Sequence, residues 1–319
     1  MHRISRREFL SSAATCSAHL ALAAVATHST ARALWALPRG RVVAREPFGN
    51  LERVSEGVWA LISTPLGGDR TTLSNGGLIA GKNGVLAIEG FNQPQGAQWL
   101  ATKARELTGR WPTHVVLTHY HADHANGVAG YLTADNKPVV HATSATRGLI
   151  LERNTPAEAS RSDALKDAAM IPATGTFDID LGGRTVRIVP RGGHTPSDCS
   201  LELDDPSIVF CGDLLWNGML PNYVDAVPTE LARSVKALRR SRTTTYVPGH
   251  GAVAQQTDFD RYEAMLAEIE RAARAAHAKG QSAKDAGADY ALPASLGDWV
   301  LFNKVFFERA FSAWYKELG

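Results

Sequence analysis

The chain has 319 residues and a formal net charge of +2 at pH 7. This near-neutral balance, with no block of Lys or Arg beyond the first residues, gives no sign of a nucleic-acid-binding protein. The length suits one sandwich-sized domain with an appendage, and no repeat or low-complexity linker divides it.

The first residues predict export from a bacterial cell. Residues 5–10 (SRREFL) are similar to a twin-arginine signal and precede a weakly apolar run over 13–26. A small-x-small cleavage site lies at 31–33, with 24–26 as a rival. We therefore expect a signal peptide over 1–33, a periplasmic protein exported in its folded state, and no stable membrane anchor after cleavage. The alternative is a basic, disordered N-terminus.

Strand and helix patterns follow in alternation. Residues 58–63 and 77–88 predict strands, with turns at 67–68 and 82–84. Apolar residues at helical spacing over 97–107 predict a helix that ends before a glycine. Such alternation is typical of layered α/β packing.

The segment 118–124 (THYHADH) carries the strongest chemical signal. It follows the apolar run 115–117, so a strand should deliver it to its carboxyl end. Imidazole nitrogen and carboxylate oxygen are the ligands that zinc prefers when water chemistry is needed. A polar surface loop is the alternative, but clustered histidines without a task are rare. The potential ligands in this segment are His119, His121, Asp123 and His124.

Three further strand-like runs each end in a potential ligand. A glycine-rich turn after 185–189 holds His194, an apolar run from 208 ends in Asp213, and a run from 246 leads to His250 between two glycines. Glycine lets the backbone approach a metal closely and lets a short turn aim the side chain. Alone, His250 would read as a turn residue and Asp213 as a helix N-cap. With 118–124, the segments predict one site.

The rest of the chain predicts helices, one hairpin and two thiols. The expected elements are a charged helix over 156–169, a hairpin of 176–181 and 184–189, an amphipathic helix over 228–238, and helices over 259–279, near 283 and over 299–318. The last helices carry an aromatic stripe of the kind that usually packs in a core. Cys199 and Cys211 are expected to be partly buried free thiols, with a disulfide as the alternative.

The order His-x-His-x-Asp-His, then separate His, Asp and His segments, resembles the metallo-β-lactamase superfamily over about residues 51–255. The resemblance implies an α/β fold: an αββα sandwich over 50–256, with a helical extension over 257–319 packed on the same domain. It also implies a dinuclear metal site at one edge of the sandwich, holding zinc, with iron or manganese as alternatives.

Residue by residue, the resemblance assigns the metal ligands. The first metal site comprises His119, His121 and His194, the second comprises Asp123, His124 and His250, and Asp213 bridges them. Glu89, where the family usually has an aspartate, matches a carboxylate that orients a ligand histidine, such as His119 or His121. Trp216, Met219, Asn222 and Tyr223, together with residues 66–72, are expected to face the substrate. Alternatively, Trp216 and Tyr223 pack against the C-terminal helices.

The expected mechanism uses a hydroxide held between the two cations to attack a carbonyl, with the metals stabilising the oxyanion. Asp213, as the bridge, and Asp123, which can steer the proton of the attacking water, are the expected catalytic residues. No serine or cysteine nucleophile is needed.

The ligand set resembles the glyoxalase II and lactonase type, so we expect a hydrolase of a small carbonyl ester, lactone or thioester. Three alternatives remain open. A periplasmic zinc β-lactamase usually has Cys or Ser at the position of Asp213. A mononuclear iron persulfide dioxygenase of the same fold needs only the equivalents of His119, His194 and Asp213. The third is a non-catalytic, metal-holding accessory protein.

Overall fold

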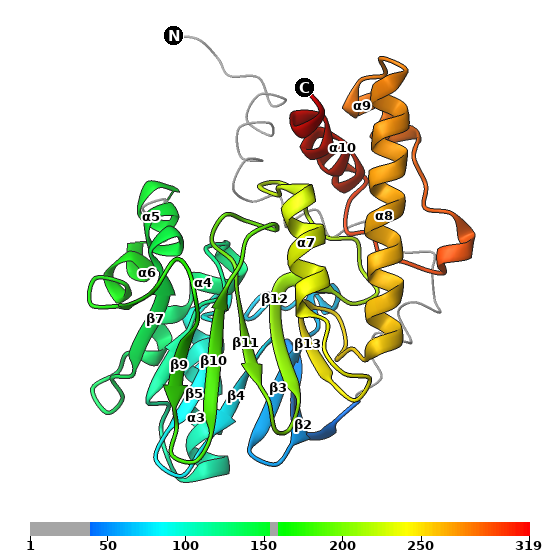
Figure 1. Cartoon of the computed structure of the whole chain (residues 1–319). Helices are drawn as coiled ribbons and strands as arrows, with labels where there is room; N and C mark the ends of the chain where they lie inside the picture. Colours follow the sequence, from blue (N-terminus) through cyan, green and yellow to red (C-terminus); the bar gives the residue numbers. More distant parts are fainter. Residues whose placement is uncertain (1–38, 154–158) are drawn as a thin grey trace.

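The structure is a computed structural model that describes residues 39–153 and 159–319. The predicted export signal and both cleavage sites lie outside the described residues. Two β-sheets face one another, and helices lie on the outer side of each (Figure 1). The αββα sandwich predicted from the sequence is therefore confirmed. In the part of the chain that the structure describes, no helix combines the length and apolar character that crossing a membrane requires.

The first sheet has eight strands that lie side by side in chain order. They are β1 (Arg41–Glu46), β2 (Gly49–Ser55), β3 (Val58–Ser63), β4 (Gly76–Ala80), β5 (Val85–Ile88), β6 (His114–Val116), β7 (Val139–Thr143) and β8 (Ala169–Ile171). Neighbours from β1 to β5 are antiparallel, whereas those from β5 to β8 are parallel. The carboxyl ends of β5 and β6 therefore meet at one edge, where Glu89 and the segment 118–124 begin.

The second sheet has five strands in the order β13-β12-β11-β10-β9. They are β9 (Phe177–Asp180), β10 (Thr185–Pro190), β11 (Cys199–Leu203), β12 (Ile208–Trp216) and β13 (Thr245–His250). Because β11 is antiparallel to both its neighbours and β13 is parallel to β12, the strands β10, β12 and β13 point the same way. Their carboxyl halves carry His194, Asp213 and His250 to one edge.

Apolar side chains fill three layers. Ile79, Ile88, Ile188 and Leu201 belong to the core between the sheets. A second core, which includes Leu100, lies where α3 covers the first sheet. A third core joins β12 to the C-terminal helices. The principal helices are α3 (Pro94–Thr108), α5 (Ser144–Arg153), α6 (Ala159–Ala164), α7 (Pro228–Leu238), α8 (Gln256–Ala278), α9 (Ala283–Asp289) and α10 (Val305–Leu318).

Two predicted helices differ from the structure. Of the helix expected over 156–169, residues 156–158 lie outside the described residues, α6 ends at Ala164, and a turn over 165–167 leads to strand β8 at the edge of the first sheet. The helix expected over 299–318 begins only at Val305. Before it, Val300 exchanges backbone hydrogen bonds with the chain near Met219, so this segment is extended. At the start of the second predicted helix, tertiary pairing overrides helical spacing.

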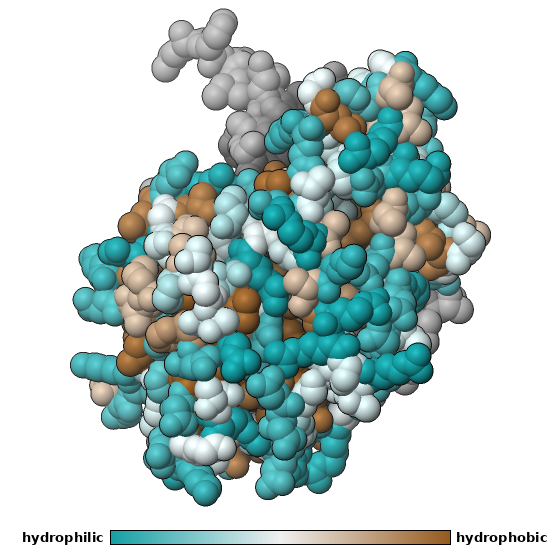
Figure 2. Space-filling model, viewed as in Figure 1, coloured by the Kyte–Doolittle hydropathy of each residue, from teal (hydrophilic) through white to brown (hydrophobic). Residues whose placement is uncertain are grey.

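The remaining short elements are α4 (Ala122–Ala125) and the 3-10 turns Pro65–Gly67, Val128–Tyr131 and Ala294–Leu296. Cys199 and Cys211 are free, as predicted, but they are fully rather than partly buried. On the face drawn in Figure 2, hydrophobic residues are scattered among hydrophilic ones, so this face presents no broad apolar area.

Candidate metal centre

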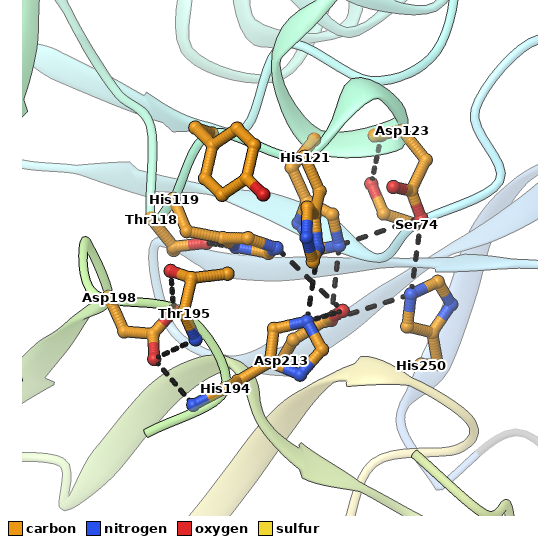
Figure 3. Close-up of polar contacts among 12 residues, drawn as sticks. Ser74, Thr118, His119, His121, Asp123, His194, Thr195, Asp198, Asp213 and His250 are labelled. Atoms are coloured by element: carbon orange, nitrogen blue, oxygen red, sulfur yellow. Dashed lines mark hydrogen bonds and ion pairs between the residues drawn. The ribbon is translucent and has the colours of Figure 1, made fainter. Parts of the chain in front are cut away.

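Seven potential ligands converge at the edge where the strand ends of both sheets meet (Figure 3). The segment after β6 supplies two histidines, and the short helix α4 supplies an aspartate and a histidine. The turn between β10 and β11, strand β12 and the end of β13 supply one residue each. All are buried, the most exposed being His121 at 8%. The residues are His119, His121, Asp123, His124, His194, Asp213 and His250.

One group consists of His119, His121, His194 and Asp213, whose donor atoms all lie within 4.8 Å of one another. The Nδ1 atom of His121 is 3.0 Å from Nε2 of His194. Oδ2 of Asp213 is 3.2 Å from Nε2 of His194 and 3.8 Å from Nε2 of His119. Three imidazoles and one carboxylate oxygen thus surround a common point.

A second group, Asp123, His124 and His250, lies on the other side of Asp213. Oδ1 of Asp213 is 3.0 Å from Nε2 of His124 and 3.4 Å from Nε2 of His250. Nε2 of His250 is also 3.3 Å from Oδ2 of Asp123. The two oxygens of Asp213 therefore divide between the two groups.

Glycine makes this close approach possible. A Cβ atom added at Gly249 would lie 1.9 Å from Oδ1 of Asp213, which is far inside van der Waals contact. The strand that carries His250 can therefore run beside Asp213 only because position 249 has no side chain.

The donor atoms fit divalent cations. Among the described residues, Nε2 of His119, His124 and His250 lacks a hydrogen-bond partner of acceptable geometry. Burying a polar atom without a partner is costly, so such atoms need an explanation. Imidazole nitrogens and carboxylate oxygens in two adjoining groups are a donor set that suits two transition-metal or zinc ions.

The histidines differ in the direction in which their surroundings shift the pKa. Burial, reinforced by nearby imidazoles, lowers the pKa of His119 well below its usual value and that of His121 to about 4. Although burial opposes it, the carboxylate of Asp213 raises the pKa of His124 well above the usual value. The same carboxylate, with Asp123, raises the pKa of His250 to about 9 against the effect of burial. A cation that binds the second group must displace these protons.

Glu89 lies behind the ligands. Its Oε1 is 2.9 Å from Nδ1 of His124 and accepts a hydrogen bond of 2.5 Å from the Thr118 hydroxyl. The imidazole beside Glu89 is thus that of His124, whereas the sequence suggested His119 or His121. The reason is α4, whose turn brings His124 back towards the end of β5. His119 is linked to Glu89 through the Thr118 hydroxyl, which lies 3.0 Å from Nδ1 of His119.

Three further residues hold ligand histidines or their turns in place and were not predicted from the sequence. Asp198 accepts hydrogen bonds from the backbone amides of His194 (2.8 Å) and Thr195 (2.9 Å), which fixes the histidine turn. Asn75 donates to the carbonyls of Pro248 and Gly251 and so clamps the turn around His250. Asp198, a few residues after a histidine, had a local signal as a turn-capping side chain.

The third, Asp225, had no local signal. It lies in the connection between β12 and α7, and its Oδ2 is 3.2 Å from Nε2 of His121.

Of the residues expected to face substrate, Trp216, Met219, Asn222 and Tyr223 are buried, whereas in the loop 66–72 only Thr72 is buried. Trp216, Met219 and Tyr223 belong to the core shared with the C-terminal helices, and Asn222 accepts a 3.0 Å hydrogen bond from Arg309. The Trp216 ring also lies 4.0 Å, centroid to centroid, from the His250 ring. In the first hairpin loop, Leu66 packs against the same core. Their contact with a substrate stays a prediction.

Known proteins match this chain in sequence. A family model described as "Metallo-beta-lactamase superfamily" matches residues 73–250. A hydroxyacylglutathione hydrolase from Acidiphilium cryptum (strain JF-5) is 30% identical over 215 residues, or 67% of this chain and 78% of that protein. An acyl-coenzyme A thioesterase from Homo sapiens is 27% identical over 169 residues, or 46% of this chain and 59% of that protein.

Solved structures match the fold. A metallo-beta-lactamase from Erythrobacter litoralis has a TM-score of 0.57 at 22% identity and covers 70% of this chain and 99% of its own. A stereoselective inverting sec-alkylsulfatase from Pseudomonas sp. has a TM-score of 0.64 at 16% identity and covers 84% of this chain and 50% of its own. At these identities, the likeness concerns the fold alone.

Proposed function

Because the chain belongs to the metallo-beta-lactamase superfamily of metal-dependent hydrolases, we propose that it hydrolyses a small carbonyl ester, lactone or thioester with two divalent cations. The observation that carries the proposal is the position of Asp213, whose two oxygens face different groups of histidines. A carboxylate in that position suits the bridge of a dinuclear centre. Zinc is the proposed metal.

We assign the ligands by these two groups. His119, His121 and His194 would hold one cation, Asp123, His124 and His250 the other, and Asp213 both. When bound, two such cations supply a water molecule of lowered pKa and an electrophile for a carbonyl oxygen. Asp213 fixes the spacing of the groups, and the carboxylate of Asp123 is the proposed acceptor of a proton from the attacking water.

Among the three substrate classes, we favour a thioester. The relatives named hydroxyacylglutathione hydrolase and acyl-coenzyme A thioesterase both carry names that describe acyl groups on a thiol. The complete second group, with Asp123, His124 and His250, speaks against the mononuclear dioxygenase alternative. Asp213, where zinc β-lactamases usually have Cys or Ser, speaks against the β-lactamase alternative.

A metal-removal experiment tests the reaction. The chain from residue 34 is purified, its metals are quantified, and it is assayed with acyl-glutathione and acyl-coenzyme A thioesters, lactones, β-lactams and sulfate esters. We expect thioester hydrolysis that is lost on chelation and restored by zinc or manganese. One iron per chain, with oxygen consumption on a persulfide, would replace the hydrolase proposal with the dioxygenase. Turnover of β-lactams alone would establish the runner-up.

We also propose that residues 1–33 direct export and that the mature enzyme, with a sandwich over 50–256 and a helical extension over 257–319, acts in the periplasm. The paired arginines in the segment SRREFL support this. Cells expressing the full chain and the double variant Arg6→Lys, Arg7→Lys are fractionated. We expect the wild-type chain in the periplasm and the variant retained in the cytoplasm. Equal export of both would contradict the twin-arginine route.

A further inference from the structure

One carboxylate outside the seven potential ligands contacts one of them directly. Oδ2 of Asp225 is 3.2 Å from Nε2 of His121. The opposite nitrogen of that ring, Nδ1, is 3.0 Å from Nε2 of His194. The His121 imidazole thus has one nitrogen facing the first ligand group and the other facing Asp225.

Asp225 is itself held from two other elements. The Tyr120 hydroxyl donates a hydrogen bond to Oδ2, and Nη1 of Arg153 at the end of α5 lies 2.9 Å from Oδ1. The Arg153 guanidinium also donates to the Tyr120 hydroxyl and lies 5.0 Å from the centre of that ring. The side chain of Asp225 is 22% exposed, so solvent competes only in part for these contacts. Two donors therefore fix the carboxylate beside His121.

We propose that Asp225 is a positioning residue that selects the His121 tautomer with its proton on Nε2 and thereby presents Nδ1 as the metal donor. Neutral imidazole has one N–H and one lone pair, and a carboxylate at Nε2 holds the N–H there. Arg153 and Tyr120 keep that carboxylate in place. The inference rests on the metal assignment in the proposed function.

Glu89 provides an internal comparison. It lies 2.9 Å from Nδ1 of His124, in the second ligand group, whereas Asp225 contacts only the first. Glu89 reaches the first group only through the Thr118 hydroxyl beside His119, so each group has one such carboxylate hydrogen-bonded directly to a ligand histidine. Loss of Asp225 should weaken binding of the cation in the first group, and loss of Glu89 should weaken mainly binding of the cation in the second group.

The test measures metal affinity rather than turnover. The purified chain is loaded with zinc, and each zinc ion is titrated out with a chromophoric chelator, in wild type, Asp225→Ala, Asp225→Asn and Glu89→Gln. Carboxylates behind ligand histidines typically contribute about 10- to 100-fold in metal affinity. We expect Asp225→Ala to bind the zinc ion of the first group about 10- to 100-fold more weakly and to keep the wild-type affinity for the other. Asp225→Asn should lose less, because its amide oxygen can still accept the Nε2 proton.

Two controls separate positioning from general stability. Asp204→Asn removes a carboxylate that also pairs with an arginine, at 2.9 Å from Arg240, and should leave both affinities unchanged. Arg153→Gln removes one of the two donors to Asp225. It should weaken binding of the same zinc ion by no more than about fivefold, as for a partly exposed ion pair. In cobalt-loaded protein, Asp225→Ala should alter the visible bands of the weakened site.

The outcomes are distinct. Wild-type affinity for both zinc ions in Asp225→Ala would overturn the inference. So would equal weakening of both ions together with a lower Tm of the metal-free variant, because that pattern marks a general loss of stability. Absence of hydrolysis in the wild-type enzyme would count against the proposed function alone, since the chelator titration does not depend on turnover.

Discussion

At the scale of single residues, the division of Asp213 between two ligand groups governs the proposed chemistry. Its buried carboxylate keeps its charge, because the His124 and His250 imidazoles hold its pKa well below the usual value against the effect of burial. A charged bridge whose oxygens face opposite ways can set the distance between two cations. Its replacement should therefore affect both cations and turnover together.

For Asp213→Ala, we expect loss of at least one metal and a fall in kcat by orders of magnitude, because the attacking water and the stabilisation of the oxyanion fail together. Metal content and steady-state kinetics on the thioester measure this. Asp213→Cys, which imitates the zinc β-lactamases, is the informative companion. Full metal content with near-normal kcat in Asp213→Ala would refute the bridging role.

For Glu89→Gln, we expect a loss of about 10- to 100-fold in affinity for the zinc ion in the His124 group, with the fold intact. The glutamine keeps the volume of the side chain but removes the charge beside His124. Chelator titration and circular dichroism measure the two effects. Glu52→Gln, in which the changed carboxylate accepts from the backbone of Arg39 and Gly40, is the matched control. Unchanged metal retention would remove Glu89 from the site.

At the scale of elements, strands β6 and β7 carry a second histidine pair that does not belong to the ligand set. His114 begins β6, and its ring stacks on that of His141 in β7 with centroids 5.4 Å apart. His141 is only 5% exposed, and neither of its ring nitrogens has a hydrogen-bond partner among the described residues. Burial, and then the neighbouring His114, lower the pKa of His141 to about 4.

This pair predicts acid sensitivity. The unfolded chain takes up the His141 proton near its usual value of 6.5, whereas the folded chain takes it up only near 4. Above pH 6.5, His141 is neutral in both the folded and the unfolded chain, so it does not lower the free energy of unfolding. As the pH drops from 6.5 towards 4, the unfolded chain binds the proton first and the free energy of unfolding falls. The loss from this residue is about 2 kcal/mol at pH 5.

Urea unfolding of the metal-free protein at pH 7.5 and pH 5 measures the effect. The variant His141→Phe should lose about 2 kcal/mol less than wild type between these two values, since it cannot bind the proton. His277→Phe on α8 is the control and should keep the wild-type difference. An equal loss in wild type and His141→Phe would show that other groups cause the acid sensitivity.

At the scale of the whole molecule, the C-terminal helices complete the core behind the candidate metal centre. Trp216, at the end of β12, contacts His250 on one side and Phe306 of α10 on another. Phe259 and Tyr262 of α8 are fully buried in the same core. Trp216, which packs against the potential ligand His250, therefore lies in the same core as the helical extension.

We expect a chain that ends at residue 256 to be insoluble or unfolded. Truncation of a single buried Phe or Trp costs about 3–5 kcal/mol, and several such losses exceed the roughly 5–15 kcal/mol that stabilises a domain. Soluble yield, circular dichroism and urea unfolding measure this. Arg271→Ala, on the exposed side of α8, should leave all three unchanged. A truncated chain with a cooperative transition near that of wild type would mark the extension as a separate domain.

The sequence by itself determined the fold class, the free state of the cysteines and the chemical types that gather at the strand ends. These features are local: alternating strands and helices, and His or Asp just after an apolar run, can be read from neighbouring positions. The tertiary structure decided the rest. It assigned one oxygen of Asp213 to each ligand group, put His124 rather than His119 beside Glu89, and brought Asp225 to His121. It also turned the start of the helix predicted over 299–318 into extended chain. Such pairings join residues distant in sequence, so they depend on how sheets, turns and helices pack, and no local pattern encodes them.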